Sequence, residues 1–192
     1  MADRAPLFLL AGGQSSRMGQ DKARVEVAGL PLILRAVAQC GYRPEEVTVV
    51  AAPGRSYADL GLLTIEDAQA HEGPFSGLVT ALGDAAAGPL LVVGCDQWGL
   101  TPEMLWALAQ AVEAGAIAAA FRGPRWHPLP LVVRSSSAAS ARAAFATGER
   151  SLWRWLEQVG AASLAEPEGW GEVVSVDDEA ALAAARAAAQ SE

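Results

Sequence analysis

Short apolar runs of four to six residues alternate with longer amphipathic or alanine-rich stretches along the chain. A run of that length suits a strand buried on both faces, and the longer stretches suit helices that cross from one strand to the next. Such alternation is typical of a parallel sheet with helices on both faces. We therefore expect an α/β three-layer sandwich with a mostly parallel, Rossmann-like central sheet.

The expected elements follow from these runs and from the turn and cap residues at their ends. Pro102 suits a first helical turn, Thr101 before it is a good N-cap, and Gly160 follows a predicted helix where a C-cap belongs. Strands are predicted at Pro6–Ala11, Glu46–Ala52, Leu62–Glu66, Leu90–Gly94, Ala116–Phe121, Leu129–Arg134 and Glu172–Val176. Helices are predicted at Pro31–Cys40, Phe75–Ala87, Pro102–Glu113, Ser136–Ala146, Ser151–Val159 and Asp178–Ala189.

Composition limits the partners that such a fold would bind. The 192 residues include 14 Lys or Arg and 22 Asp or Glu, a net charge of −8, and 52% of the residues are apolar. The apolar fraction is ample for a core, and the length suits one domain. Nucleic acids and anionic membranes require net or clustered positive charge, so we expect neither as a partner.

The two cysteines and the first apolar run indicate the compartment. Cys40 and Cys95 lie in apolar stretches and have neither a disulfide-framework spacing nor a metal-ligand spacing. The run Leu7–Ala11 is too short for a signal peptide or a membrane span. We expect a cytoplasmic protein.

The loop after the first predicted strand concentrates residues that bind phosphate. Ligands of such sheets bind beyond the carboxyl ends of the strands, and here the chain reads GGQSSRMGQDK over Gly12–Lys22. Glycines let backbone N–H groups approach phosphate oxygens, the serines add hydroxyl donors, and Arg17 and Lys22 add charged donors. The loop is neither a Walker A motif nor a Rossmann fingerprint. We interpret it as a phosphate-binding loop, with an ordinary surface loop as the alternative.

Lysine usage singles out one residue of this loop. Of the 14 basic residues, 13 are arginine, and Lys22 is the single lysine. An ammonium is a compact charge that sits between several phosphate oxygens, whereas a planar guanidinium imposes its own geometry. We therefore interpret Lys22 as a functional residue.

The segment LAGGQSSRMGQDKA resembles the signature of the molybdenum cofactor guanylyltransferases, the MobA family, which are nucleotidyltransferases of the glycosyltransferase-A-like, nucleotide-diphospho-sugar transferase fold. Related cytidylyl and sugar-nucleotide enzymes share the glycine-rich start but usually lack the combination of Gly-Gly, Arg-Met-Gly and Asp-Lys. Further matches follow in order: Ile65–Asp67, Gly73–Gly77, Cys95–Asp96, His127–Pro128, Gly148–Arg150 and Val174–Leu182. The resemblance implies a single nucleotidyltransferase domain over residues 1–192, with nucleotide bound by its N-terminal part and molybdopterin by its C-terminal part.

On the nucleotide side, the resemblance implies that Lys22 contacts the triphosphate, Asp67 the nucleotide, and Asp96 both the nucleotide and Mg²⁺. Asp96 also follows a predicted strand, where a carboxylate oxygen would reach a metal bound to phosphates. A turn or helix cap is the alternative for both aspartates. The implied nucleotide-binding residues are Leu10, Ala11, Gly12, Gly13, Ser15, Lys22, Asp67 and Asp96, and the implied catalytic residues are Arg17, Lys22 and Asp96.

On the acceptor side, the resemblance points to the helix start at Gly73, Pro74 and Gly77, whose backbone N–H groups would face an anion. It also points to His127 near the second substrate and to Arg150 at the pterin phosphate. A plain tight turn, a structural histidine and a surface charge are the respective alternatives. Two tryptophans, Trp155 and Trp170, would stack on a pterin, although core or interface packing is the favoured interpretation.

The second metal ligand is less well specified. Asp177 directly follows the last predicted strand, so it would either complete the Mg²⁺ site opposite Asp96 or cap the next helix together with Asp178. Relatives often have asparagines where this chain has Ser175 and Asp177.

Two further departures from the family pattern lie beside the predicted site. Ala51 and Ala52 stand where some relatives carry an asparagine that touches the nucleotide. Gln97 and Trp98 follow Asp96 where relatives tend to have a small residue and proline, so we expect a reshaped pocket wall there.

The implied reaction is attack of the molybdopterin phosphate on the α-phosphorus of GTP, which releases pyrophosphate and forms molybdopterin guanine dinucleotide. Molybdopterin-delivering proteins and acceptor molybdoenzymes are the implied partners. Three alternatives stay open: a molybdopterin cytidylyltransferase or sugar-nucleotide pyrophosphorylase on the same fold, a non-catalytic nucleotide or molybdopterin carrier, and a GTPase-type switch. The absence of a Walker A lysine-serine pair disfavours the last.

Overall fold

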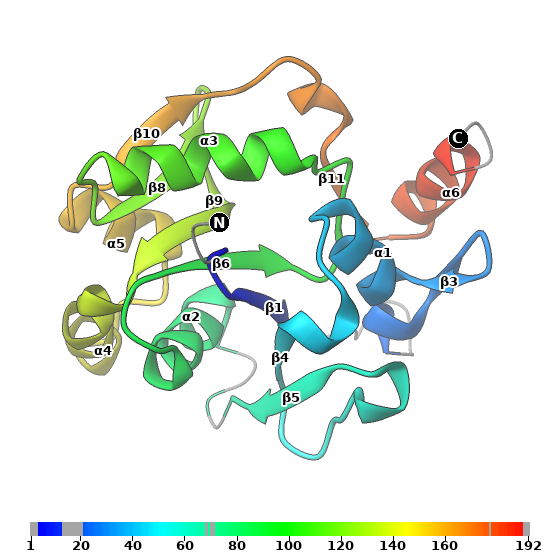
Figure 1. Ribbon diagram of the computed structural model, residues 1–192, viewed down its shortest axis with the longest axis horizontal. Helices are drawn as coiled ribbons and strands as arrows, with labels where there is room; N and C mark the ends of the chain where they lie inside the picture. The colour runs from blue at the N-terminus through cyan, green and yellow to red at the C-terminus, as the bar shows by residue number, and fades with distance from the viewer. Residues whose placement is uncertain (1–3, 13–20, 68, 70–71, 177, 190–192) are drawn as a thin grey trace.

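The computed structural model describes residues 4–12, 21–67, 69, 72–176 and 178–189 (Figure 1). A seven-stranded sheet lies at the centre, in the order β10-β8-β9-β6-β1-β4-β5. Its strands are β1 (Leu7–Ala11), β4 (Val47–Ala51), β5 (Leu63–Glu66), β6 (Pro89–Gly94), β8 (Ala118–Arg122), β9 (Trp126–Arg134) and β10 (Ala162–Ala165). Strand β9 pairs antiparallel with both of its neighbours, and all other pairings are parallel. The predicted mostly parallel sheet is confirmed.

Within the described residues, six α-helices pack on the two faces of the sheet and at its end. They are α1 (Leu32–Gln39), α2 (Pro74–Asp84), α3 (Pro102–Glu113), α4 (Ala138–Ala146), α5 (Leu152–Gln158) and α6 (Glu179–Ala188). All six predicted helices are present with small shifts at their ends. The predicted cap at Thr101 is confirmed, since its side chain accepts a hydrogen bond from the Met104 N–H at 3.4 Å.

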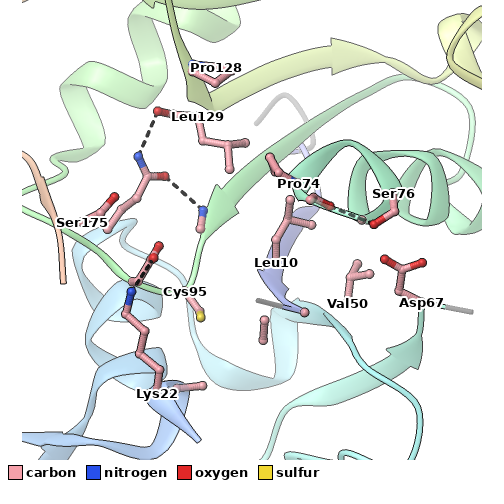
Figure 2. Close-up of a pocket in the computed structure, with 18 of the residues that line it drawn as sticks. Leu10, Lys22, Val50, Asp67, Pro74, Ser76, Cys95, Pro128, Leu129 and Ser175 are labelled. Carbon is pink, nitrogen blue, oxygen red and sulfur yellow. Dashed lines mark hydrogen bonds and ion pairs between the residues drawn. The ribbon is translucent and has the colours of Figure 1, made fainter. Parts of the chain in front are cut away.

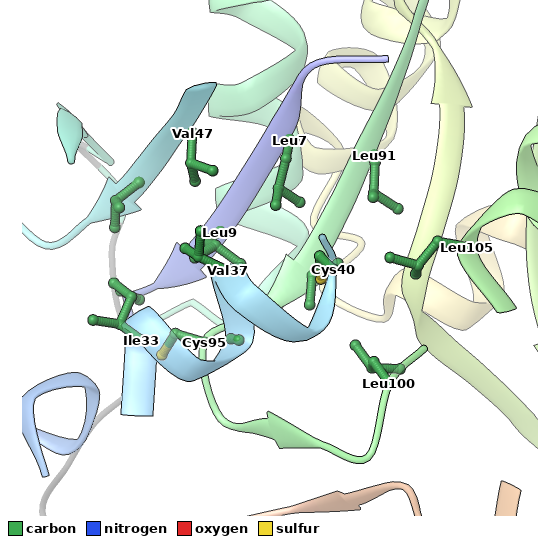
Figure 3. Packing of buried hydrophobic residues seen from close by; sticks show 14 of the residues in the cluster. Leu7, Leu9, Ile33, Val37, Cys40, Val47, Leu91, Cys95, Leu100 and Leu105 are labelled. Atoms are coloured by element: carbon green, nitrogen blue, oxygen red, sulfur yellow. The ribbon is translucent and has the colours of Figure 1, made fainter. Parts of the chain in front are cut away.

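The side chains of β1 show how the sheet separates two cores. Leu7 and Leu9 point to one face, while Phe8 points to the other, because successive strand residues alternate. The first core packs against α1 and α3, and Figure 3 shows Ile33 and Val37 of α1 beside the leucines of β1. The second core packs against α2, α4 and α5. The three-layer α/β architecture is therefore confirmed.

One predicted strand belongs elsewhere, and one strand of the sheet was not predicted. The sheet edge is β10, whose residues Ala162–Ala165 are half-buried or exposed and weak in β-propensity, so the sequence carried little strand signal there. The predicted strand Glu172–Val176 contains only β11 (Val174–Ser175), which pairs with β7 (Gln97–Trp98) outside the central sheet.

A third apolar cluster joins the β2–β3 region to the C-terminal helix. It combines Val27 of β2 (Glu26–Val27), which pairs with β3 (Leu30–Pro31), with Trp98 of β7 and Leu182 of α6. This cluster lies beyond the carboxyl end of β6, where it supports the segment that follows that strand. Among the described residues, no helix is long and apolar enough to cross a bilayer.

Candidate functional site

A cavity of about 750 Å³ opens at the carboxyl ends of β1, β4 and β6 (Figure 2). This is the edge at which parallel α/β sheets bind ligands. One wall follows β1 and contains the Lys22 region, a second follows β6, and a third is the start of β9. The cavity is lined by Leu10, Ala11, Gly12, Asp21, Lys22, Ala23, Val50, Asp67, Gly73, Pro74, Ser76, Gly77, Gly94, Cys95, Asp96, Gln97, His127, Pro128, Leu129, Trp170, Val173 and Ser175.

An ion pair crosses the cavity between two of these walls. Lys22 Nζ donates to Asp96 Oδ2 at 2.8 Å, and the two side chains are 15% and 27% exposed. Partial burial strengthens such a pair relative to one on the open surface. The structure thus places one positive and one negative group in contact at the carboxyl edge of the sheet.

The turn that carries Lys22 is fixed from below by Asp21. The Asp21 carboxylate accepts from the Ala23 N–H at 3.1 Å and so caps the short 3-10 helix Lys22–Arg24. The hydroxyl of Tyr57, a fully buried residue, donates to Asp21 Oδ2 at 3.0 Å. Burial, followed by the Asp21 charge, raises the pKa of Tyr57 well above its ordinary value, so this hydroxyl stays a donor.

On the opposite wall, Asp96 folds back over Gly94. A Cβ atom added at Gly94 would lie 2.7 Å from Asp96 Oδ1, which is closer than a real contact permits. The glycine therefore gives the carboxylate its space. Beside them, burial raises the pKa of the Cys95 thiol, so this cysteine lines the cavity as a small apolar group and not as a thiolate.

Asp67 and Gly77 form the far side of the cavity. Asp67 is buried, and its Oδ1 accepts from the Gln69 N–H at 3.0 Å and from the Thr80 hydroxyl at 3.1 Å. These bonds join the end of β5 to α2. A Cβ at Gly77 would meet Leu10 at 3.0 Å, so the glycine lets α2 approach the end of β1 closely.

His127 stands at the start of β9 in a small polar and aromatic group. Its Nε2 lies 2.6 Å from Glu166 Oε1, and its ring centre lies 4.8 Å from that of Trp170. The Trp170 ring also packs on Phe121 at 4.9 Å. This group closes the side of the cavity remote from Asp67.

Comparison with known proteins places this chain in a family. The family model described as MobA-like NTP transferase domain matches residues 7–164, which is most of the chain. The chain belongs to the MobA-like NTP transferases.

Relatives of this MobA-like chain agree with that assignment. It is 35% identical to the molybdenum cofactor guanylyltransferase of Shewanella amazonensis over 81% of this chain and 82% of that one. It is 32% identical to the enzyme of the same name from Shewanella woodyi over the same shares.

Solved structures of low identity share the fold. Molybdopterin-guanine dinucleotide biosynthesis protein A from Archaeoglobus fulgidus superposes with a TM-score of 0.78 at 21% identity, covering 97% of this chain and 99% of that one. A 2-C-methyl-D-erythritol 4-phosphate cytidylyltransferase from Thermus thermophilus gives 0.75 at 17% identity, over 97% and 100%.

Most of the residues singled out in this MobA-like sequence meet in the cavity. The structure brings together Leu10, Ala11, Gly12, Lys22, Asp67, Gly73, Pro74, Gly77, Asp96 and His127. Gly13, Ser15, Arg17 and Asp177 lie outside the described residues. Their roles stay predictions.

Arg150 is not among the residues that line the cavity. Its guanidinium forms an ion pair with Glu72, donates to the Phe145 carbonyl at 2.7 Å, and lies 3.9 Å from the centre of the Phe145 ring. Its carbonyl oxygen would be 3.9 Å from a Cβ added at Gly73, so its backbone approaches the cavity rim. Contact between Arg150 and a substrate stays a prediction.

Trp155 and Trp170 have different positions. Trp155 is fully buried in the second core against Phe75, with ring centres 5.5 Å apart, so the core interpretation is confirmed for it. Trp170 lines the cavity.

The sequence alone assigned no role to Asp21 or Tyr57, and it marked Gln97 only as a departure from the family pattern. The Asp-Lys pair in the phosphate-binding loop was a signal for Asp21. No local pattern marks Tyr57, because its contact with Asp21 spans 36 positions.

The oxygen atoms that line the cavity are of a kind that binds a hard cation. Asp96, Asp21 and Ser175 line it with carboxylate and hydroxyl oxygens, the ligand type that Mg²⁺ prefers. Within the described part of the chain, no group of three or more His, Cys, Asp or Glu side chains forms a ready-made metal cage. That arrangement matches Mg²⁺ bound through one or two carboxylates together with substrate phosphates.

Proposed function

We propose that this chain transfers GMP from GTP to the phosphate of molybdenum-loaded molybdopterin, releasing pyrophosphate and forming molybdopterin guanine dinucleotide. The observation that carries the proposal is the Lys22–Asp96 pair, which spans a cavity at the carboxyl edge of the sheet in a MobA-like chain. The curated relatives named molybdenum cofactor guanylyltransferase support the choice of reaction.

The reaction needs positioning and charge neutralisation more than proton transfer. An oxygen of the acceptor phosphate forms a bond to the α-phosphorus of GTP, the bond from that phosphorus to the β-phosphate oxygen breaks, and pyrophosphate carries away the electron pair. No general base is required, because a phosphate monoester is largely ionised at neutral pH. The protein therefore contributes aligned donors and charges.

Named residues supply those contributions. Lys22 binds triphosphate oxygens with its ammonium, and Gly12 lets the backbone approach the nucleotide at the end of β1. Asp67 and Val50 enclose the nucleotide on the side of α2. In the same proposal, the loop residues Gly13, Ser15 and Arg17 donate further hydrogen bonds to the phosphates.

Mg²⁺ is the proposed cofactor, with Asp96 as its protein ligand and Asp177 as a further one. When bound, Mg²⁺ neutralises negative charge on the phosphates. The Lys22 ammonium already occupies one oxygen of Asp96. The remaining oxygen, Oδ1, lies over Gly94, whose lack of a side chain leaves space for it.

The C-terminal half of the single domain is the proposed acceptor side. His127 and Trp170 offer a hydrogen-bonding ring edge and an aromatic face for the pterin, and Gly73, Pro74 and Gly77 close the rim. The same proposal places the reaction in the cytoplasm, with molybdopterin received from a delivering protein and the product passed to acceptor molybdoenzymes.

The experiment that tests this function supplies Mg²⁺, molybdenum-loaded molybdopterin and each α-³²P-labelled nucleoside triphosphate in turn. Label in a dinucleotide from GTP alone is the expected result. Label from CTP instead would make the chain a molybdopterin cytidylyltransferase and would direct attention to Ala51 beside the nucleotide site. Nucleotide binding without transfer from any of them would favour a non-catalytic carrier and overturn the proposal.

A further inference from the structure

Gln97, the residue after Asp96, is a buried polar residue beside the central sheet. Gln97 lines the cavity, yet its side chain is buried, with the residue only 8% exposed. A long amide at this point therefore needs a structural explanation.

Both ends of the Gln97 amide are hydrogen-bonded. The Gly94 N–H donates to Gln97 Oε1 at 3.0 Å, and Gln97 Nε2 donates to the Leu129 carbonyl at 2.9 Å (Figure 2). The amide thus links the last residue of β6 to the beginning of β9. The amide oxygen accepts from one backbone and the amide nitrogen donates to the other, as the C=O and N–H of a peptide group would.

The register of the two strands shows what this link replaces. Strands β6 and β9 pair antiparallel through Val92 and Leu131. Gly94 and Leu129 lie two residues further along their strands, so they would face each other if the same register continued past Val93 and Pro130. Between them the side-chain amide stands in for direct contact between the backbones. The strand ends are held apart at the cavity without leaving their polar groups unpaired.

A third segment, β11 and the residue after it, holds the backbone of Asp96 and Gln97. The Gln97 backbone pairs with Ser175 of β11, and the Val176 N–H donates to the Asp96 carbonyl at 2.9 Å. The Cβ position of Gly94 is crowded by Asp96 Oδ1 at 2.7 Å and by Gln97 Cγ at 3.4 Å. The carboxylate and the amide therefore lie over the same glycine.

We propose that Gln97 is a positioning residue that holds β6 and β9 apart and fixes the orientation of the Asp96 carboxylate. The inference rests on the proposed function, in which Asp96 binds Mg²⁺ and nucleotide and β9 begins the acceptor side. Gln97 sets the separation of the two substrate sides and touches neither reacting atom.

Two substitutions test the proposal. Gln97→Met keeps a long unbranched side chain and loses both hydrogen bonds, whereas Gln97→Glu keeps the acceptor and loses the donor to Leu129. Gln39→Met on α1 is the matched control, because it makes the same change at a partly buried glutamine away from the cavity.

The readouts are kcat, KM for both substrates, the Mg²⁺ concentration at half-maximal rate, thermal midpoint, and GTP affinity with and without Mg²⁺. We expect kcat to fall by roughly 10- to 100-fold in Gln97→Met, the size expected when reacting groups shift by about an ångström. The increase in GTP affinity caused by Mg²⁺ should shrink at least about threefold, while Mg²⁺-free GTP affinity should change by less than about twofold. Gln39→Met should match the wild type in kcat and in the Mg²⁺ effect on GTP affinity.

A purely structural role gives a different pattern. A lowered thermal midpoint with kcat and the Mg²⁺ effect on GTP affinity both unchanged would overturn the proposal, as would unchanged values in both folded variants. If Gln97→Met does not fold, Gln97→Glu decides by the same criteria. A wild-type protein that transfers no nucleotide would refute the proposed function, whereas the Mg²⁺-dependent binding comparison would still decide the role of Gln97.

Discussion

Lys22 and Asp96 lie 74 positions apart in the sequence, and their side chains meet at 2.8 Å across the cavity. Asp21 and Tyr57 fix the first residue from one wall, and Gly94 gives the second its space on the other. In the proposed function, a triphosphate that enters would share the ammonium with a carboxylate already in place. The pair keeps both charged groups aimed at the cavity before any ligand arrives.

Removing either member of this pair should reduce turnover. We expect Lys22→Ala and Asp96→Ala each to lower kcat by at least about tenfold, because each removes charge aligned with the phosphates. Initial rates of nucleotide transfer measure the effect, and circular dichroism checks that the fold is intact. Arg43→Ala, which removes an exposed ion pair with Glu46, is the control and should leave the rate unchanged. Near-normal turnover in both variants would contradict the assignment.

Gly94→Ala should impair the site more than the fold. The new methyl group would meet Asp96 Oδ1 and force the carboxylate to move, so kcat should fall by roughly tenfold or more. Gly83→Ala is the matched control, since nothing lies within 4 Å of a Cβ at this exposed position of α2. There the substitution should stabilise the protein by about 0.5–1 kcal/mol. Urea unfolding and transfer rates distinguish the two, and equal rates in both variants would refute the steric argument.

Trp155 should matter for stability and not for chemistry. Its ring is fully buried between Phe75 and neighbouring residues of the second core. Trp155→Ala should lower the free energy of unfolding by about 3–5 kcal/mol. Trp106→Ala changes a tryptophan that is 65% exposed and should cost less than about 0.5 kcal/mol. Equal losses in the two variants, measured by urea unfolding, would show that the core is misassigned.

Alkaline pH should destabilise the fold through a buried thiol. Burial raises the pKa of Cys40 to about 12, whereas the unfolded thiol ionises near its ordinary value of about 8.5. Above that ordinary value the unfolded state loses a proton that the folded state keeps. The free energy of unfolding should therefore fall with rising pH, by about 1.4 kcal/mol per pH unit for this group.

Cys40→Ala checks the origin of that slope. Urea unfolding at about pH 7 and about pH 10, in the presence of reductant, should give a smaller loss of stability in the variant than in the wild type. The other groups with raised pKa, including Tyr57, act in the same direction and should keep part of the slope. An identical slope in both proteins would exclude Cys40 as its source.

The sequence allowed the sheet, the helices and the cavity edge to be predicted, because buried strands and helix caps leave local patterns. The loop predicted to bind phosphate and Asp96 were singled out for a similar reason, because each follows a strong apolar run, and their roles stay predictions. Strand β10 was missed because Ala162–Ala165 is a partly exposed edge with little apolar signal. Tyr57 and the bridging amide of Gln97 were missed because their functions depend on partners far away in sequence.

The third apolar cluster has a consequence for synthesis. Trp98, next to the Asp96 turn, packs against Val176 and Leu182, and Ser175 lines the cavity. Val176 and Leu182 follow every strand of the central sheet in the chain, so they are synthesised after all of those strands. The support behind the Asp96 turn is therefore the last part of this wall to be made.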